Sequence, residues 1–392
     1  MTGETPESRA DLEGIYQGAI TPTLASLRRD FKPWHKPRKH FLRLEQWCHE
    51  TRALLKKECF SSCEEIRYLG LPADDMLDIR VMEGVCKKAK IKLRYLGFNS
   101  SLQSSELNLS KHRVNASGFI HQSSVVIADR IEGLSPQARN IMARRYLLQH
   151  APFDVINLDL CNSVARAEPD GIFPYLEAIR TICDVQLQRR WQPWLMFLTT
   201  RTTRDRQSDS VKRNLFSQLL ENLGNPAFVK ALQEKLAMHG DQIRAEVETT
   251  KQLEGLDWGR AYVPSLSKWL LHYMMNSDYK CGIRMLPSYI YSVQTGEMDM
   301  VSTAFICEPP LVDREDNTGL TAPRLSAVVP PQTPTEPDLA IAIIEQIAAM
   351  QDLDKKLKDD RNLREKFIKK SSSLMAAIGY DTAAYAKFAK AL

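Results

Sequence analysis

The segment from residue 65 to residue 99 constrains the fold more than any other part of the chain. Residues 66–69 and 92–96 have the composition of strands, and the residues between them have the pattern of a helix. Strand, helix and strand in this order form a parallel β-α-β unit. This segment is therefore expected to begin a doubly wound, Rossmann-like α/β sheet. In such sheets a ligand lies near the loop after the first strand.

Three further strands and a hairpin are expected to complete this sheet. The strands are residues 124–128, 153–159 and 194–199, with helices predicted between them at 139–149 and 175–188. After a long helical section at 209–276, residues 282–291 and 298–307 predict an antiparallel hairpin with a glycine-containing turn. Pro287 lies inside the first hairpin strand, which suits an edge position or a bulge. Five parallel strands closed by a hairpin are typical of class I methyltransferases, and we expect that fold.

The composition indicates a cytoplasmic protein. Hydrophobic residues make up 43% and charged residues 26%, as in ordinary globular proteins. We find neither an apolar run of the roughly 18 residues that a membrane span needs nor the apolar core of a signal peptide. The eight cysteines form no C-x-x-C pair, so reduced thiols are expected rather than a zinc site. The net charge of +5 permits nucleic-acid binding without requiring it.

Four regions are predicted along the chain. Residues 1–64 form an N-terminal helical and basic arm, and residues 65–307 form the α/β domain. Residues 308–337 are a proline-rich linker, followed by a C-terminal helical module at 338–392. That module is too small to bury much surface alone. It is expected to dock on the main domain, a second copy of the chain or another protein.

Polar residues follow several predicted strands and form the candidate ligand site. The loop after the first strand has one glycine and two carboxylates where nucleotide-binding proteins usually have several glycines. The candidate cofactor-binding residues are Gly70, Pro72, Asp74, Asp75, Asn99, Asp129 and Asn157. Asp159 and Asn162, after the fourth strand, are the candidate catalytic residues. The alternative interpretation is that Asp159 caps a helix or a turn.

Three stretches resemble the methyltransferase-like family of three-Cys-motif partner proteins. These are residues 35–41, 68–73 and 157–162, and the resemblance extends over roughly residues 35–200. It implies a scaffold that binds S-adenosylmethionine and a role in bacterial, anti-phage defence. The chain departs from the pattern of such enzymes, because Asp74, Asp75 and Met76 replace the loop glycines and two further positions differ. Gly70 replaces the acidic residue that ends the first strand, and Asn99 replaces the carboxylate that binds the ribose.

Two basic clusters are candidates for nucleic-acid contact. Residues 31–43 contain five Lys or Arg and two His with no acidic residue, interleaved with aromatic side chains. Arg201 and Arg204 begin the second cluster, after the fifth strand. The candidate contacts are Lys36, Arg38, Lys39, Arg43, Arg201 and Arg204. The alternative is an arm that packs through its aromatic residues and leaves its cations in water.

These features leave three functions open. The first is a methyltransferase-like protein with an altered cofactor loop that binds nucleic acid or a protein partner in a complex. The second is an active S-adenosylmethionine-dependent methyltransferase acting on nucleic acid, with Asp159 near the substrate. The third is a metal-dependent nuclease built on the aspartates at the strand ends, because clustered carboxylates bind magnesium. The sequence contains no Walker loop, G-x-S-x-G or HExxH motif.

Overall fold

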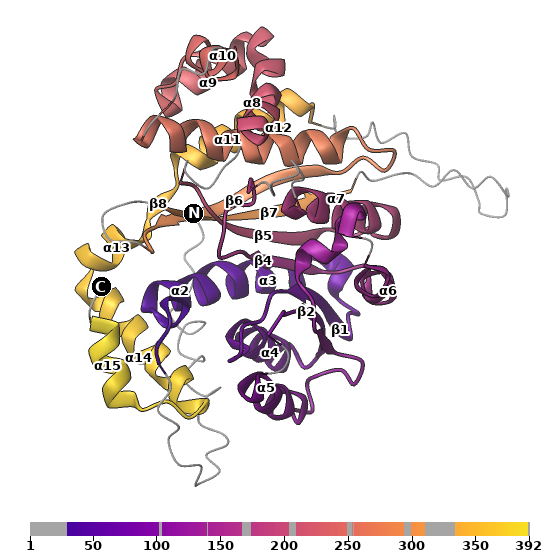
Figure 1. The fold of residues 1–392 in the computed structure, drawn as a ribbon, viewed down its shortest axis with the longest axis vertical. Helices are drawn as coiled ribbons and strands as arrows, with labels where there is room; N and C mark the ends of the chain where they lie inside the picture. The colour runs from indigo at the N-terminus through magenta and orange to yellow at the C-terminus, as the bar shows by residue number, and fades with distance from the viewer. Residues whose placement is uncertain are drawn as a thin grey trace, which may run out of the picture.

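The computed structural model describes residues 30–101, 104–138, 140–166, 174–203, 209–248, 253, 255–293, 299–309 and 334–390. Its centre is an eight-stranded sheet of order β3-β2-β1-β4-β5-β7-β6-β8 (Figure 1). The strands are β1 (Glu65–Gly70), β2 (Lys92–Phe98), β3 (Val125–Ile127), β4 (Val155–Asp159), β5 (Trp194–Arg201), β6 (Gly282–Tyr291), β7 (Met300–Glu308) and β8 (Gln351–Asp352).

The strand pairing confirms the expected class I methyltransferase fold. Strands β1 to β5 are all parallel, and β7 pairs antiparallel with both β5 and β6. The register of β6 shifts between Leu286 and Tyr289, which places a bulge at Pro287 where proline lacks a ladder donor. The short strand β8 was not expected; it pairs parallel with β6 at the edge of the sheet.

Helices cover both faces of the sheet (Figure 1). Alternate strand residues enter different cores, as Tyr68 and Leu69 show. The core on one face includes α6 (Ile141–His150), α7 (Pro174–Arg189), α8 (Asp209–Glu221), α9 (Pro226–Leu236), α10 (Gly240–Glu248), α11 (Gly255–Met275) and α12 (Glu336–Ala348). The core on the other face includes α2 (Pro37–Phe41), α3 (Cys48–Leu55), α4 (Leu77–Ala89), α5 (Ser105–Asn115), α13 (Leu353–Asp359), α14 (Arg361–Ala377) and α15 (Thr382–Lys390).

Short helical turns complete the described elements. A π-helical segment, Leu42–Trp47, joins α2 to α3. The 3-10 turns are Pro33–His35, Glu58–Phe60, Ile131–Leu134, Pro136–Ala138 and Asn222–Gly224. The expected helical section at 209–276 consists of four helices; α9 begins where Asn225 caps it and Pro226 occupies its first turn.

The predicted C-terminal module divides between the two cores. Helix α12 contributes Ile343 and Ile344 to the core that contains α8–α11. Helices α13–α15 pack on the opposite face, beside α2 (Figure 1). The predicted domain boundary at residue 338 stays a prediction. Three predicted segments lie outside the described residues: residues 1–29, the hairpin turn at 294–297 and most of the proline-rich linker.

Candidate functional site

An ion pair lies at the carboxyl end of β4, where the ligand crevice was expected. Lys39, on α2, is buried, and its Nζ donates to Asp159 Oδ1 at 2.5 Å and to the Tyr291 hydroxyl at 3.2 Å. Burial alone would lower the Lys39 pKa, but Asp159 and Tyr291 together raise it above its ordinary value. Lys39 is therefore a charged ammonium that neutralises the candidate catalytic carboxylate from inside the chain.

A second polar group links β1, β4 and α4 beneath this ion pair. The Tyr68 hydroxyl donates to Asp78 Oδ2 at 3.0 Å and accepts from Asn157 Nδ2 at 2.9 Å. Burial raises the pKa of both Tyr68 and Asp78. The Asn157 Oδ1 atom is buried and has no hydrogen-bond partner in the described part of the chain. Asn157 is one of the candidate cofactor-binding residues, so this oxygen is an unsatisfied acceptor within the candidate site.

Side chains of the chain itself take up the space beside the ends of β1 and β2. A Cβ on Gly70 would lie 2.5 Å from the Tyr68 ring, and one on Gly97 would lie 2.7 Å from Pro72. Asn99 Nδ2 donates to the Pro72 carbonyl at 2.8 Å. In nucleotide-binding loops, glycine lets the backbone approach a ligand. Here the two glycines make room for Tyr68 and Pro72 instead.

The acidic residues of this loop and of β3 also have partners within the chain. Asp75 is buried and accepts from His35 Nε2 at 3.0 Å and from the Tyr380 hydroxyl at 3.1 Å. Burial lowers the His35 pKa, against the opposing effect of Asp75. Asp74 is half-buried beside it. Asp129 accepts from the Arg130 amide at 2.7 Å and from the Asn140 side chain, so it stabilises the turn after β3.

These separate partners argue against the predicted cluster of metal-binding aspartates. Asp75 contacts His35, Asp78 contacts Tyr68, and Asp159 contacts Lys39. Among the residues that the structure describes, no three His, Cys, Asp or Glu side chains are arranged to hold a metal ion.

Four of the five cations of the basic arm, Lys36, Arg38, Lys39 and Arg43, bind groups of the chain itself. Lys36 Nζ donates to the Phe388 carbonyl at 2.9 Å, and Arg38 Nη1 lies 2.6 Å from Asp354 Oδ1. Arg43 is buried and donates to the Trp34 carbonyl at 3.0 Å. Contact of these residues and Lys39 with nucleic acid stays a prediction. The alternative, in which the cations extend into water, fits Lys32, which is exposed, but not these four, which have partners within the chain.

The aromatic part of the alternative is supported. Phe31 stacks on Tyr380 and Phe388 with ring centroids 5.3 and 4.9 Å apart. Phe41 lies 4.9 Å from Phe367 of α14. The arm thus packs against α14 and α15, as the indigo and yellow ribbons of Figure 1 show.

The second basic cluster is described only in part. Arg201 Nη1 lies 2.8 Å from Asp299 Oδ2, and its Nε donates to the Cys161 carbonyl at 3.0 Å. Arg201 is therefore held in place by the chain, whereas Arg204 lies outside the described residues. Asn162 is half-exposed, and its carbonyl accepts from the Arg201 amide at 3.4 Å.

Three side chains of the site were not identified as site residues from the sequence. Tyr291 was not among the candidate site residues, and neither His35 nor Tyr380 was linked to the loop after β1. Tyr380 is separated from Asp75 by 305 positions. The sequence gives no sign of such a contact, because no periodicity connects residues so far apart.

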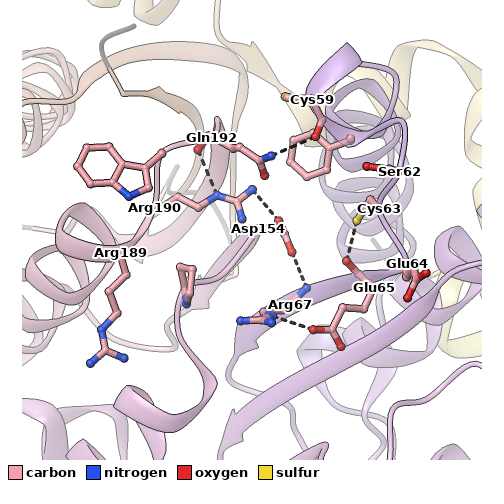
Figure 2. A pocket seen from close by; sticks show the side chains of 13 residues that line it. Cys59, Ser62, Cys63, Glu64, Glu65, Arg67, Asp154, Arg189, Arg190 and Gln192 are labelled. Atoms are coloured by element: carbon pink, nitrogen blue, oxygen red, sulfur yellow. Dashed lines mark hydrogen bonds and ion pairs between the residues drawn. The ribbon is translucent and has the colours of Figure 1, made fainter. Parts of the chain in front are cut away.

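A pocket of about 500 Å³ lies at the opposite, amino-terminal end of the sheet (Figure 2). Asp154 occupies its wall, accepting from the Arg67 amide at 2.7 Å and lying 2.7 Å from Arg190 Nη2. Burial raises the Asp154 pKa, while Arg190 opposes that effect. Trp191 is exposed at the rim. Because Asp154 pairs with Arg190 across the ends of β4 and α7, we assign this ion pair to holding the strand ends together.

Comparison with known proteins places the chain in a family. A family model described as PP_RS20740-like matches residues 28–390. The chain belongs to the PP_RS20740-like family. No curated protein matches it. A solved structure from Listeria monocytogenes, described as a class I S-adenosylmethionine-dependent methyltransferase, is 11% identical over 73% of this chain, with a TM-score of 0.34. The chain spans 65% of the length of that structure, and we draw no functional conclusion from the likeness.

No helix among the described residues of this family member is long and apolar enough to cross a membrane.

Proposed function

We propose that this protein uses a methyltransferase fold for binding, as a component of a larger assembly, and that it does not bind S-adenosylmethionine in the usual crevice. The observation that carries the proposal is the 2.5 Å ion pair between Lys39 and Asp159. S-adenosylmethionine is cationic at its sulfonium and its amine, and the chain's own ammonium already occupies the carboxylate at the end of β4.

The surrounding residues do not fit the cofactor. A nucleoside needs a backbone that it can approach closely after β1, but Tyr68 and Pro72 fill the space that Gly70 and Gly97 leave. Its ribose needs an acceptor after β2, but the Asn99 amide donates to the Pro72 carbonyl and its oxygen accepts from Ser101. Both features favour a binding protein over an enzyme that uses this cofactor.

The resemblance to three-Cys-motif partner proteins supports the remainder of the proposal. It suggests a cytoplasmic, bacterial protein that contacts nucleic acid or a protein partner, with a role in defence against phage. The docked helices α13–α15 provide a surface additional to the methyltransferase fold on which such a partner could bind.

A second candidate is an active methyltransferase acting on nucleic acid. Asn157 Oδ1 favours it, because a buried acceptor without a partner is uncommon and a ligand hydroxyl or amine would satisfy it. The Asp159 side chain is also 25% exposed, so solvent reaches this end of the sheet.

Isothermal titration calorimetry separates the two candidates. We expect S-adenosylmethionine and S-adenosylhomocysteine to bind the full chain no more tightly than about 100 μM, roughly 5 kcal/mol. S-adenosylhomocysteine lacks the sulfonium charge but keeps the amine and the carboxylate. Tighter binding of this product than of S-adenosylmethionine would indicate exclusion by the charge of Lys39, and equally weak binding of both would indicate exclusion by the crowded loop. Tighter binding of S-adenosylmethionine that Asp159→Ala removes would contradict the proposal and support the methyltransferase.

A further inference from the structure

The three C-terminal helices carry the net charge of the whole protein. Residues 353–390 contain ten Lys or Arg and five Asp or Glu, a net charge of +5. The formal net charge of the complete chain is also +5. The other residues are therefore balanced, and the positive charge is concentrated on α13–α15.

The acidic groups of these helices have local structural roles. Asp354 pairs with Arg38, and Glu365 pairs with Arg361 at 2.8 Å. Asp360 caps α14 by accepting from the Leu363 amide. In all, four of the five carboxylates accept hydrogen bonds within the chain: Asp354, Asp360, Glu365 and Asp381. Their charges are already counted in the net charge of +5, so an excess of five cations remains on these helices.

One face of α14 forms a continuous row of polar, exposed side chains, which we call the α14 stripe. Its residues recur at helical spacing and are Asn362, Lys366, Lys369 and Ser373. None of the four is acidic. The opposite face, with Phe367 and Leu374, is buried in the core of the module. At 1.5 Å of rise per residue, the stripe is about 16 Å long. Exposed lysines also occur on the neighbouring helices: Lys355, Lys358, Lys387 and Lys390.

We propose that the α14 stripe binds the phosphate backbone of nucleic acid. This inference rests on the proposed function, because it identifies the partner of a protein that acts by binding. Double-stranded DNA carries one negative charge per about 1.7 Å of helix axis, so a stripe of this length faces several phosphates. Ammonium, amide and hydroxyl groups are the donors that make such backbone contacts.

The composition of the stripe argues against other partners. Protein interfaces have an apolar, aromatic core and are depleted in lysine, and this stripe contains no apolar side chain. Basic residues are attracted to anionic membranes, but stable binding of a helix to a membrane surface also takes an apolar face that enters the lipid. The apolar face of α14 is already buried. Nucleic acid is the partner that a polar, cationic helix face fits best.

Fluorescence anisotropy of labelled duplex DNA and single-stranded RNA, titrated with the full chain across a salt series, tests the proposal. We expect at least one of the two to bind. We expect the Lys366→Ala/Lys369→Ala variant to bind it at least 10-fold more weakly. Its salt slope should be smaller by about 1.8 on duplex DNA or about 1.4 on single-stranded RNA, because two phosphate contacts are lost.

The matched control is Lys230→Ala/Lys235→Ala, which removes two exposed lysines from α9, far from α14 (Figure 1). It should leave affinity and slope unchanged, and circular dichroism should show both variants folded. Absence of binding at low salt, or equal weakening by both variants, would overturn the inference. So would competition by polyglutamate as effective as that by unlabelled DNA, which would indicate an acidic protein partner. The calorimetric result for S-adenosylmethionine does not enter this experiment, so the two proposals fail separately.

Discussion

Single residues at the expected ligand crevice are satisfied by one another. Lys39 neutralises Asp159, and Tyr68 connects Asp78 with Asn157. A buried charge or hydroxyl without a partner costs several kcal/mol, so each of these groups requires one. The same residue types that could hold a ligand here hold parts of the chain together.

The Lys39–Asp159 pair gives a stability prediction. Asp159→Ala leaves an ammonium buried without its counter-ion, and we expect unfolding free energy to fall by about 3 kcal/mol, the lower end for a buried pair because Asp159 is partly exposed. The double variant Lys39→Met/Asp159→Ala should lose less, because it removes the unpaired charge. Urea denaturation measures both.

The exposed pair Lys57–Glu308, 3.4 Å apart, provides the control. Lys57→Ala should cost about 1 kcal/mol or less, as exposed ion pairs do. A double variant less stable than Asp159→Ala alone would show that the ammonium of Lys39 is not the source of the penalty.

At the scale of elements, Asp154 connects three segments at the amino-terminal end of the sheet. It precedes β4, accepts from the amide of Arg67 in β1, and pairs with Arg190 just after α7 (Figure 2). Both side chains of the pair are less than a tenth exposed. The ion pair therefore fixes the positions of adjacent strands relative to the helix that connects β4 to β5.

We expect Arg190→Ala to lower the unfolding free energy by about 3–5 kcal/mol, because the Asp154 carboxylate stays buried without its cation. Arg189→Ala changes the neighbouring, exposed arginine and should cost about 1 kcal/mol or less. Thermal and urea unfolding of the two variants compare them directly. Equal losses would contradict the role assigned to the buried pair.

At the scale of the whole molecule, the N-terminal arm and the C-terminal helices form one layer over one face of the sheet. His40 lies inside this layer, and neither of its ring nitrogens has a partner among the described residues. Burial, followed by the charges of Arg43 and Lys370, lowers its pKa well below the ordinary value of 6.5. The folded protein therefore keeps His40 neutral where the unfolded chain would protonate it.

This difference makes stability depend on pH. Below pH 6.5 the unfolded state binds a proton that folded His40 does not, so we expect stability to fall as pH decreases, by at most about 1.4 kcal/mol per pH unit. His35 contributes in the same direction, because burial lowers its pKa too. His40→Leu should flatten the decline, and the exposed His239→Gln should not. Urea denaturation between pH 5 and pH 7 checks this, and identical slopes for all three proteins would contradict it.

The sequence alone determined the sheet apart from its short edge strand β8. Continuous apolar segments predicted β3 and β5, and the Gly-containing hairpin with Pro287 predicted the antiparallel end and its bulge. These elements follow from local periodicity and turn chemistry, which neighbouring residues fix. The sequence also placed the ends of β1 and β4 at one edge of the sheet, because parallel strands bring their carboxyl ends together, and Gly70 and Asn157 are neighbours there.

Only the tertiary structure decided what those residues contact. The sequence shows that Lys39, Asp75 and Asp159 are charged, but not that Lys39 meets Asp159 or that Tyr380 meets Asp75. These contacts depend on how the two ends of the chain pack on the sheet. Lys39 and Asp159 are 120 positions apart in the sequence, and Asp75 and Tyr380 are 305 positions apart. Charge identifies a group that needs a partner; the packing of distant helices selects whether that partner is a ligand or the protein itself.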